Sequence, residues 1–202
     1  MEVTIEEITL EQALADLRDD VLVGARSMLG LTLVRGERRA RVVEVEAYRT
    51  PDDPASHAHR GKTPRNAIMF GEAGLAYVYF NYGVHWMLNV TAHSEGDAAA
   101  VLIRAAQPIE DLDEMRSLRP KAKRDEDLLS GPGKLAAAFE ITGADTGTPL
   151  FSGEELRFEQ GSQPSRVLSG PRIGIRVGLE HNWRFVDGDA LRWVSAEKSG
   201  MV

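Results

Sequence analysis

The chain has 202 residues, of which 43% are hydrophobic and 27% charged, a balance typical of a folded globular protein. This length predicts one domain over residues 1–202 with a single core. The sequence contains no cysteine, which excludes disulfides, zinc–thiolate sites, iron–sulfur clusters held by cysteine and thiol nucleophiles. No apolar run approaches the ~18 residues of a membrane span, and the opening MEVTIEEITLEQ is acidic, unlike a signal peptide. We therefore expect a soluble cytoplasmic protein.

The net charge of −7 argues mildly against nucleic-acid binding, which depends on Lys and Arg. Net charge is a sum, however, whereas a binding face is local. Basic residues cluster at Arg60, Lys62 and Arg65, and again in RPKAKR from Arg119 to Arg124. Each cluster is either a solvated face or a phosphate contact, and composition does not choose between them.

The first half of the chain predicts two helices, two strands and a loop. In chain order these are helices over Leu10–Leu17 and Val21–Leu29, strands over Leu31–Val34 and Ala40–Tyr48, and an irregular loop over Thr50–Arg65. Gly30 is the stop signal of the second helix, and the GERR of Gly36–Arg39 is a turn between the strands.

The second half predicts more strands and two further helices. They are strands over Leu75–Phe80, His85–Thr91 and Ala99–Ala105, a helix over Ile109–Leu118, a short helix from SGPGKL to about Phe139, and short strands over Arg172–Val177 and Leu191–Val194. Pro108 favours the start of the first of these helices. Antiparallel strands and helices without a βαβ rhythm indicate an α+β fold.

The segment RVVEVEAY is the most informative strand. Alternate residues of a strand share a face. One face is apolar and suits a core: Val43, Val45 and Ala47. The other carries two carboxylates and an aromatic ring: Val42, Glu44, Glu46 and Tyr48. That second face is either exposed to solvent or the wall of a pocket in which a carboxylate acts beside a stacking ring.

The hairpin LAYVYFNYGVHWMLNV carries aromatic side chains in two settings. Tyr77 and Tyr79 point to one face of their strand, opposite to Val78 and Phe80. Tyr82 falls at the turn, next to glycine. It is either a partly covered surface residue or an outward wedge that enters a base stack when a nucleotide is extruded.

Two further motifs are weak. His57 and His59 form an H-x-H pair that a metal-dependent hydrolase would use with Asp52 or Asp53, but no further ligands stand at helical spacing, so we expect no metal site. SGPGK lacks the spacing of a Walker motif. It predicts a serine-capped helix start whose free N–H groups, with Lys134, meet a DNA phosphate.

Taken together, the motifs resemble those of the alkyladenine (3-methyladenine) DNA glycosylases. The matching pieces, spread between Val21 and Trp193, are VEVEAYRTPDDPASH, KTPRNAIMF, GLAYVYFNYGVHWMLNV, VLIRAAQP, SGPGKL and PRIGI. The resemblance implies one α+β domain, a curved, mostly antiparallel, open-barrel-like sheet with surrounding helices. It implies a monofunctional enzyme of base excision repair that flips a damaged purine out of double-stranded DNA and releases it hydrolytically. It implies no cofactor, a monomer and no obligate protein partner.

The resemblance also implies the roles of individual residues. Glu46 matches the general base, Arg104 matches the arginine that holds the attacking water, and the carbonyl of Ile173 completes that water's site. A second group binds the substrate. Tyr48 and Tyr79 stack on the two faces of the flipped base. His57 closes the pocket, and Asn89 excludes the amino group of guanine. Residues expected to contact DNA are the intercalating Tyr82, with Met69, Leu102, Arg65 and Lys134.

The chain departs from the family pattern in three places. RFVDGDALRWVS is loosely similar to the family's last strands, AEKSGMV matches nothing, and the loops after His57 and Asn89 differ in length. These changes leave open which damaged base is preferred. An alternative is a non-catalytic module that recognises damaged DNA, against which the joint presence of Glu46 and Arg104 argues, because a binder has no use for a pair that activates water.

Overall fold

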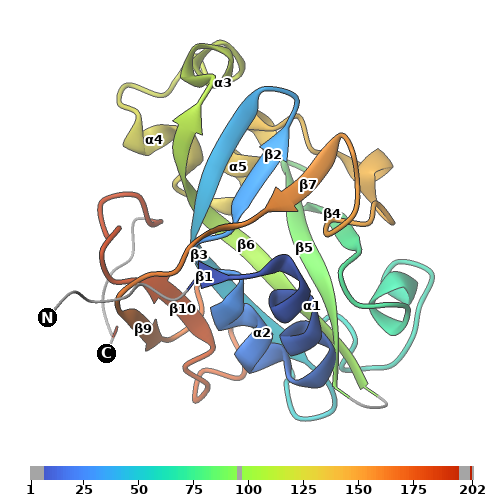
Figure 1. Cartoon of the computed structure of the whole chain (residues 1–202). Helices are drawn as coiled ribbons and strands as arrows, with labels where there is room; N and C mark the ends of the chain where they lie inside the picture. Colours follow the sequence, from blue (N-terminus) through green and yellow to red (C-terminus); the bar gives the residue numbers. More distant parts are fainter. Residues whose placement is uncertain (1–6, 95–96, 196–200, 202) are drawn as a thin grey trace, which may run out of the picture.

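The computed structural model describes residues 7–94, 97–195 and 201; the start of the acidic opening segment and most of the tail AEKSGMV lie outside them. Its centre is an antiparallel sheet with the strand order β4-β5-β6-β3-β10-β9, which β2 and β7 extend beside β3 (Figure 1). The bounds in that order are Ala76–Asn81, His85–Ser94, Asp97–Glu110, Arg38–Arg49, Arg184–Asp187 and Val167–Gly170, with β2 at Thr32–Arg35 and β7 at Leu156–Glu159. The small strands β1 (Glu7–Ile8) and β8 (Gly161–Ser162) pair with each other.

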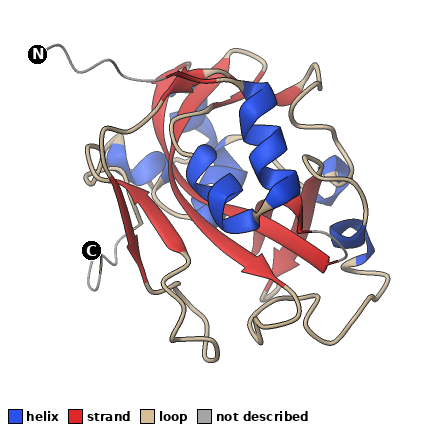
Figure 2. Ribbon diagram, turned by 60° about the horizontal axis from the view of Figure 1, so that its bottom comes forward, coloured by secondary structure: helices blue, strands red, loops and turns tan. Residues whose placement is uncertain are grey.

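The helices are short and surround this curved sheet (Figure 2). They are α1 (Leu10–Asp19), α2 (Val21–Ser27), α3 (Leu112–Leu118), α4 (Glu126–Leu129) and α5 (Pro132–Ala138), with 3-10 turns η1 (Ala67–Phe70) and η2 (Gly143–Asp145). Thr9 caps α1 and Asp20 caps α2 through their side chains. The arrangement confirms the expected α+β fold with a curved antiparallel sheet.

One face of the sheet packs against the main core, and the other lines a cavity. Val101 and Ile103 of β6 point into the main core, which α1, α2 and α5 complete. The intervening Leu102 and Arg104 point to the opposite face, where they line a cavity. The strict alternation of a β-strand therefore gives β6 one side for packing and one side for chemistry.

A β-bulge in β3 corrects the faces expected for that strand. The pairing of β3 with β6 shifts register between Val42 and Glu44 and again before Val45. As a result Val42 lies in the main core, whereas Val43 packs in a smaller cluster with Trp193. The expectation that Val43 belongs to the core face and Val42 to the other was wrong, because the bulge reverses the alternation.

Three other expectations were wrong. Pro108 and Ile109 belong to β6, whose pairing with β3 continues to Glu110, so the helix begins only at Leu112. Long-range pairing there overrides the local helix signal. Residues 172–177 form bends and 191–194 a turn followed by a bend, and the late strands are β9 and β10 instead. The start of α5 is capped by Gly131, without a bond from Ser130.

Candidate active site

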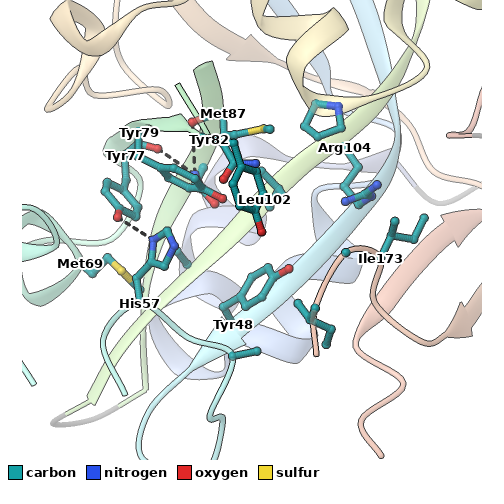
Figure 3. Close-up of a pocket in the computed structure, with 17 residues that line it drawn as sticks. Tyr48, His57, Met69, Tyr77, Tyr79, Tyr82, Met87, Leu102, Arg104 and Ile173 are labelled. Carbon is teal, nitrogen blue, oxygen red and sulfur yellow. Dashed lines mark hydrogen bonds between the residues drawn. The ribbon is translucent and has the colours of Figure 1, made fainter. Parts of the chain in front are cut away.

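A cavity of about 310 Å³ opens on the face of the sheet opposite to the main core (Figure 3). It falls within the size range of small-ligand pockets. Its lining residues are Tyr48, Ala55, His57, Met69, Tyr77, Tyr79, Asn81, Tyr82, Met87, Asn89, Ala100, Leu102, Arg104, Pro132, Ile173, Gly174 and Ile175. They come from β3 to β6, from the β4–β5 turn, from η1, from the start of α5 and from two loops, so the curl of the sheet brings distant segments to one recess.

Glu46 lies behind this wall with no exposed surface. Its Oε2 accepts bonds from the Tyr48 hydroxyl at 2.8 Å and from Nη1 of Arg104 at 3.2 Å. Its Oε1 accepts the backbone N–H of Ile173 at 2.7 Å. All three donors line the cavity. The interpretation of this strand face as solvent-exposed was therefore wrong, and three donors hold the buried carboxylate in place.

Glu44 is equally buried and forms a second carboxylate site beside the first. Its Oε1 accepts Nε of Arg104 at 3.0 Å and Nε of Arg184 at 2.7 Å. Both oxygens also bond to Ser195, through the hydroxyl at 2.7 Å and the backbone N–H at 2.6 Å. Two carboxylates and two guanidinium groups thus balance their charge below the cavity, as buried ions require.

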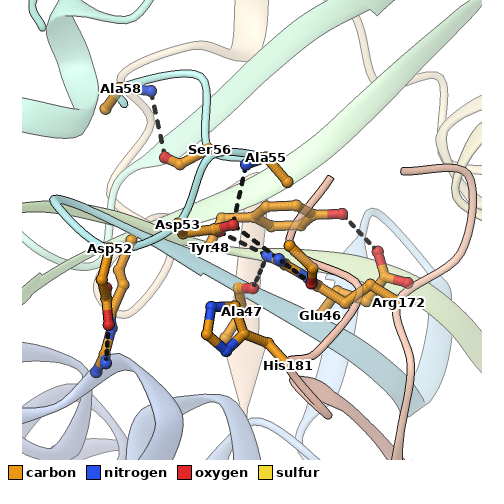
Figure 4. A network of polar contacts seen from close by, with 12 residues as sticks. Glu46, Ala47, Tyr48, Asp52, Asp53, Ala55, Ser56, Ala58, Arg172 and His181 are labelled. Carbon is orange, nitrogen blue, oxygen red and sulfur yellow. Dashed lines mark hydrogen bonds and ion pairs between the residues drawn. The ribbon is translucent and has the colours of Figure 1, made fainter. Parts of the chain in front are cut away.

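Tyr48 joins the cavity to a second buried ion pair (Figure 4). The guanidinium of Arg172 lies 4.6 Å from the centre of the Tyr48 ring and makes two bonds to Asp53, at 2.6 and 2.7 Å. The cation and the ring attract each other. Burial, followed by the charge and hydrogen bond of Glu46, raises the pKa of Tyr48 well above its usual value, so its phenol remains a donor.

Three rings form the opposite side of the cavity. Nδ1 of His57 lies 2.9 Å from the Tyr77 hydroxyl, and the His57 ring meets Tyr79 edge-on at 4.5 Å between centres. Burial and then the charge of Arg65 lower the pKa of His57, which favours the neutral imidazole. Burial raises the pKa of Tyr79 to about 12. Tyr79 is therefore uncharged near neutral pH.

The loop between β3 and η1 is held in place by Asn66, which is buried. Its amide donates to the carbonyls of His57 and Gly61 at 2.8 and 3.0 Å, and its oxygen accepts the N–H of Thr63 at 2.6 Å. The irregular loop expected here is confirmed. Its hydrogen bonds fix the position of His57 at the cavity mouth.

The other expected site residues lie either in the wall of the cavity or at its rim. Asn89, Met69 and Leu102 are buried in the cavity wall, and the Asn89 amide donates to the Tyr77 carbonyl at 3.0 Å. Met69 and Leu102, expected as DNA contacts, thus lie in the recess rather than on the outer surface. At the rim, Tyr82 is 87% exposed at the hairpin tip with a φ of 49°.

The two expected basic contacts are placed differently. Arg65 is exposed beside the cavity, with its guanidinium 5.5 Å from the centre of the Tyr79 ring. Lys134 donates to the Ser130 hydroxyl at 3.0 Å within the turn that precedes and begins α5. It does not line the cavity, although its neighbour Pro132 does.

The alternative, a metal centre, would need a cluster of ligands. The described residues contain no group of three or more His, Asp or Glu that could hold an ion. Asp53 is engaged by Arg172 and Asp52 by Arg49, while His57 contacts Tyr77. Within the same described ranges, no helix is long and apolar enough to cross a bilayer.

Some residues of this site were not singled out from the sequence. Arg172 falls in a segment that we expected to be a strand, and Arg184 and Ser195 follow it without any motif. Tyr77 was visible as the partner of Tyr79 on one strand face, and Glu44 as the second carboxylate of its strand. Alternation could have assigned these last two to the site.

Comparison with known proteins agrees with this geometry. A family model of the methylpurine-DNA glycosylases matches residues 15–190. A relative from Burkholderia lata is 47% identical over 165 residues, 80% of each chain. A relative from Methanocella arvoryzae is 45% identical over 170 residues, 81% of this chain and 85% of its own. One from Nocardia farcinica is 41% identical over 191 residues, 91% and 86% of the two chains. All three are provisionally named 3-methyladenine DNA glycosylases.

The family match covers the strands that carry the two buried carboxylates, the tyrosine-lined cavity and the exposed tyrosine of the hairpin. The chain therefore belongs to the methylpurine-DNA glycosylase family, a group of DNA repair enzymes that hydrolyse N-glycosyl bonds.

Proposed function

We propose that this chain is a monofunctional DNA glycosylase that releases alkylated or deaminated purines with a water activated by Glu46. The observation that carries the proposal is the contact of Glu46 with Arg104 and Ile173 at the wall of a tyrosine-lined cavity of about 310 Å³. The substrate class comprises 3-methyladenine, 7-methylguanine, hypoxanthine and ethenoadenine. The names of the relatives support the first of these.

The proposed step is a hydrolysis in which Glu46 is the general base. The bond between the sugar C1′ and the purine nitrogen breaks, and the base departs with the electron pair while positive charge builds on the sugar. Water attacks C1′, and Glu46 takes its proton, leaving an abasic site. The carboxylate also stabilises the charge on the sugar. Arg104 donates to the Glu46 carboxylate at 3.2 Å and helps to hold the water.

The acceptor capacity of Glu46 fits this role. A carboxylate has about four lone-pair sites. Among the described residues, Oε2 takes two donors, from Tyr48 and Arg104, and Oε1 takes one, from Ile173. Oε1 therefore retains capacity for a water molecule, and we propose that the Ile173 carbonyl is that water's second acceptor.

The residues around the cavity support the monofunctional character. A bifunctional glycosylase needs an amine that attacks the sugar and forms a Schiff base. The described lining residues include no lysine, and Lys134 bonds to Ser130 outside the lining. Hydrolysis by water is thus the chemistry that this lining favours.

Binding of the flipped base rests on aromatic rings. We propose that Tyr48 and Tyr79 stack on its two faces, with His57 at its edge. Stacking on aromatic side chains contributes about 1–3 kcal/mol per base, which offsets an extrusion cost of a few kcal/mol. A cationic alkylated purine gains further attraction from the tyrosine faces.

Selectivity against guanine is assigned to Asn89. Its amide lies in the buried wall and donates to the Tyr77 carbonyl at 3.0 Å and to the Met87 carbonyl at 3.3 Å. These two bonds hold the side chain in place, so it cannot move away from an exocyclic amino group. A normal guanine then meets steric exclusion and an unpaired polar group.

We propose that the partner is double-stranded DNA with a damaged purine, bound by a monomer in the cytoplasm without an obligate protein partner. Tyr82 would occupy the space that the flipped nucleotide leaves. Arg65 at the rim and Lys134 near the start of α5 would contact phosphates. The rest of the surface is acidic on average, which keeps affinity for undamaged DNA low.

The test is a panel of duplexes, each with one damaged purine, incubated with wild-type protein and the Glu46→Gln variant. Wild type should release at least one lesion and leave abasic sites, whereas Glu46→Gln should bind the same duplex and release almost nothing. Release by Glu46→Gln at the wild-type single-turnover rate would refute the role of Glu46. Loss of activity after exhaustive chelation would favour a metal-dependent hydrolase instead.

A further inference from the structure

We propose that Glu44 and Ser195 are positioning residues that fix the guanidinium of Arg104 against Glu46. The inference rests on the proposed function, because it concerns how the water-activating pair is held. Through Ser195, the segment that follows Trp193 then contributes to the geometry of the active site. Neither residue lines the cavity, so both act through Arg104 and not on the substrate.

The three nitrogens of Arg104 each have a separate partner. Nε donates to Glu44 at 3.0 Å, Nη1 to Glu46 at 3.2 Å and Nη2 to the Ser195 hydroxyl at 3.4 Å. A planar guanidinium that is fixed at Nε and Nη2 has no freedom to rotate about its long axis. Glu44 and Ser195 therefore determine where Nη1 points.

Glu44 is suited to this task because it is itself immobile. Its carboxylate is fully buried and accepts four bonds: from Arg104, from Arg184, and from the hydroxyl and the backbone N–H of Ser195. Three of these bonds end on Oε1 and one on Oε2. The bulge on either side of Glu44 in β3 accompanies this placement, and bulges often direct a side chain beside an active site.

Packing of the segment around Trp193 places Ser195 beside Glu44. Trp193 and Val194 are buried in a cluster with Val43, the residue that the bulge turns away from the main core. This cluster anchors the segment beside β3, and the serine that follows reaches Glu44 across 151 positions of the chain. Ser195 also lies beyond residues 15–190, the part that the family model matches.

A purely structural role would give a different result from a positioning role. If the Ser195 hydroxyl only stabilised the fold, its loss would lower the free energy of unfolding and leave the chemical step unchanged. If it orients Arg104, its loss would slow base release in a fully folded protein, while affinity for damaged DNA stays the same. Its effect would also vanish once Arg104 is removed, because coupled residues are not additive.

The experiment compares Ser195→Ala, Arg104→Ala and the double variant in long single-turnover incubations with one lesion duplex. Ser195→Ala keeps the backbone N–H to Glu44 and removes only the hydroxyl. We expect release to slow by about tenfold, in line with the loss of one hydrogen bond to a charged group. In the Arg104→Ala background the same change should have no further effect, and lesion binding should be unchanged in Ser195→Ala.

The matched control is Ser27→Ala, since Ser27 is also buried and its hydroxyl also donates to a carboxylate, that of Asp16 in α1. It should lose stability without losing rate. A wild-type rate in Ser195→Ala, or equal losses in both backgrounds, would overturn the inference. If Glu46→Gln is inactive in the same assay while Ser195→Ala is normal, only this inference fails; if Glu46→Gln is active, the proposed function fails.

Discussion

The hydroxyl of Tyr48 donates a hydrogen bond of 2.8 Å to Oε2 of Glu46, two residues earlier on the same strand. The Tyr48 ring lines the cavity, and Arg172 lies over it at 4.6 Å. One side chain therefore serves both halves of the proposed reaction: its ring binds the base, and its phenol orients the carboxylate.

Tyr48→Phe should separate these two tasks. The ring remains, so affinity for a lesion duplex should change little. Glu46 loses one of the three donors that the described residues supply. A hydrogen bond to a charged group contributes roughly 1.5–3 kcal/mol, so single-turnover release should fall about 10- to 100-fold. Tyr48→Leu, which also removes the ring, should lose affinity as well. Equal rates in Tyr48→Phe and wild type would contradict the orienting role.

Tyr82→Ser should weaken binding without affecting the fold. Tyr82 is 87% exposed, so its removal costs no core packing. Its backbone has a φ of 49°, which is uncommon for tyrosine and serine alike, so the exchange adds no new strain. We expect an unchanged melting temperature and a loss of affinity for lesion duplexes, because the space left by the extruded nucleotide is no longer filled.

The control for this wedge is Val84→Ser on the same hairpin tip, where Val84 is 63% exposed. It removes a neighbouring apolar side chain but not the ring. Affinity should therefore fall in Tyr82→Ser far more than in Val84→Ser. Unchanged affinity in Tyr82→Ser, measured by titration of a labelled duplex, would count against the wedge.

Local patterns in the sequence were enough for much of the site. Alternation placed Tyr77 and Tyr79 on one face of β4, and the Tyr–Gly pair marked the hairpin tip, because both signals arise from residues close in the chain. The motif residues Glu46 and Arg104, although 58 positions apart, are brought together as the family resemblance implied. Their strands pair directly in the sheet.

Other features depend on contacts that no local pattern encodes. The bulge at Glu44 appears only when β3 is paired with β6, and it reverses the faces that strict alternation predicts. The segment from Arg172 has β-branched residues but forms bends, and its arginine is bound by Asp53 and by the Ala47 carbonyl. Ser195 reaches Glu44 from the far end of the chain.

His57 should make the stability of the protein depend on pH. Burial, and then the charge of Arg65, lowers the pKa of His57 from its usual 6.5. The unfolded chain therefore binds a proton more readily than the folded chain does. The part of the free energy of unfolding that depends on a neutral His57 is therefore fully present above about pH 6.5. It is lost as the pH falls toward the lowered pKa of His57 in the folded protein.

Denaturant unfolding between pH 7.5 and 5 measures this effect. The free energy of unfolding should fall more steeply with acidification in wild type than in His57→Gln, which has no imidazole to protonate. The control is His59→Gln, on the same loop but outside the cavity lining; it should follow wild type. Parallel curves for wild type and His57→Gln would contradict the prediction.

Two neighbouring aspartates allow a test of the buried ion pair below Tyr48. Asp53 and Arg172 have fully buried side chains and are joined by bonds of 2.6 and 2.7 Å, whereas Asp52 pairs with Arg49 at the surface with 47% of its side chain exposed. Removal of one partner from a buried pair leaves an uncompensated charge, which costs about 3–5 kcal/mol. An exposed pair contributes about 0–1 kcal/mol.

Asp53→Asn should therefore lower the free energy of unfolding several-fold more than Asp52→Asn, as measured by urea unfolding with an unchanged dependence on denaturant. Asp53→Asn should also slow base release under conditions where it remains folded, because Arg172 lies over the Tyr48 ring and its neighbour Ile173 donates to Glu46. Asp52→Asn should release the base at the wild-type rate. Equal stability of the two variants would mean that the Asp53–Arg172 pair does not hold this side of the cavity.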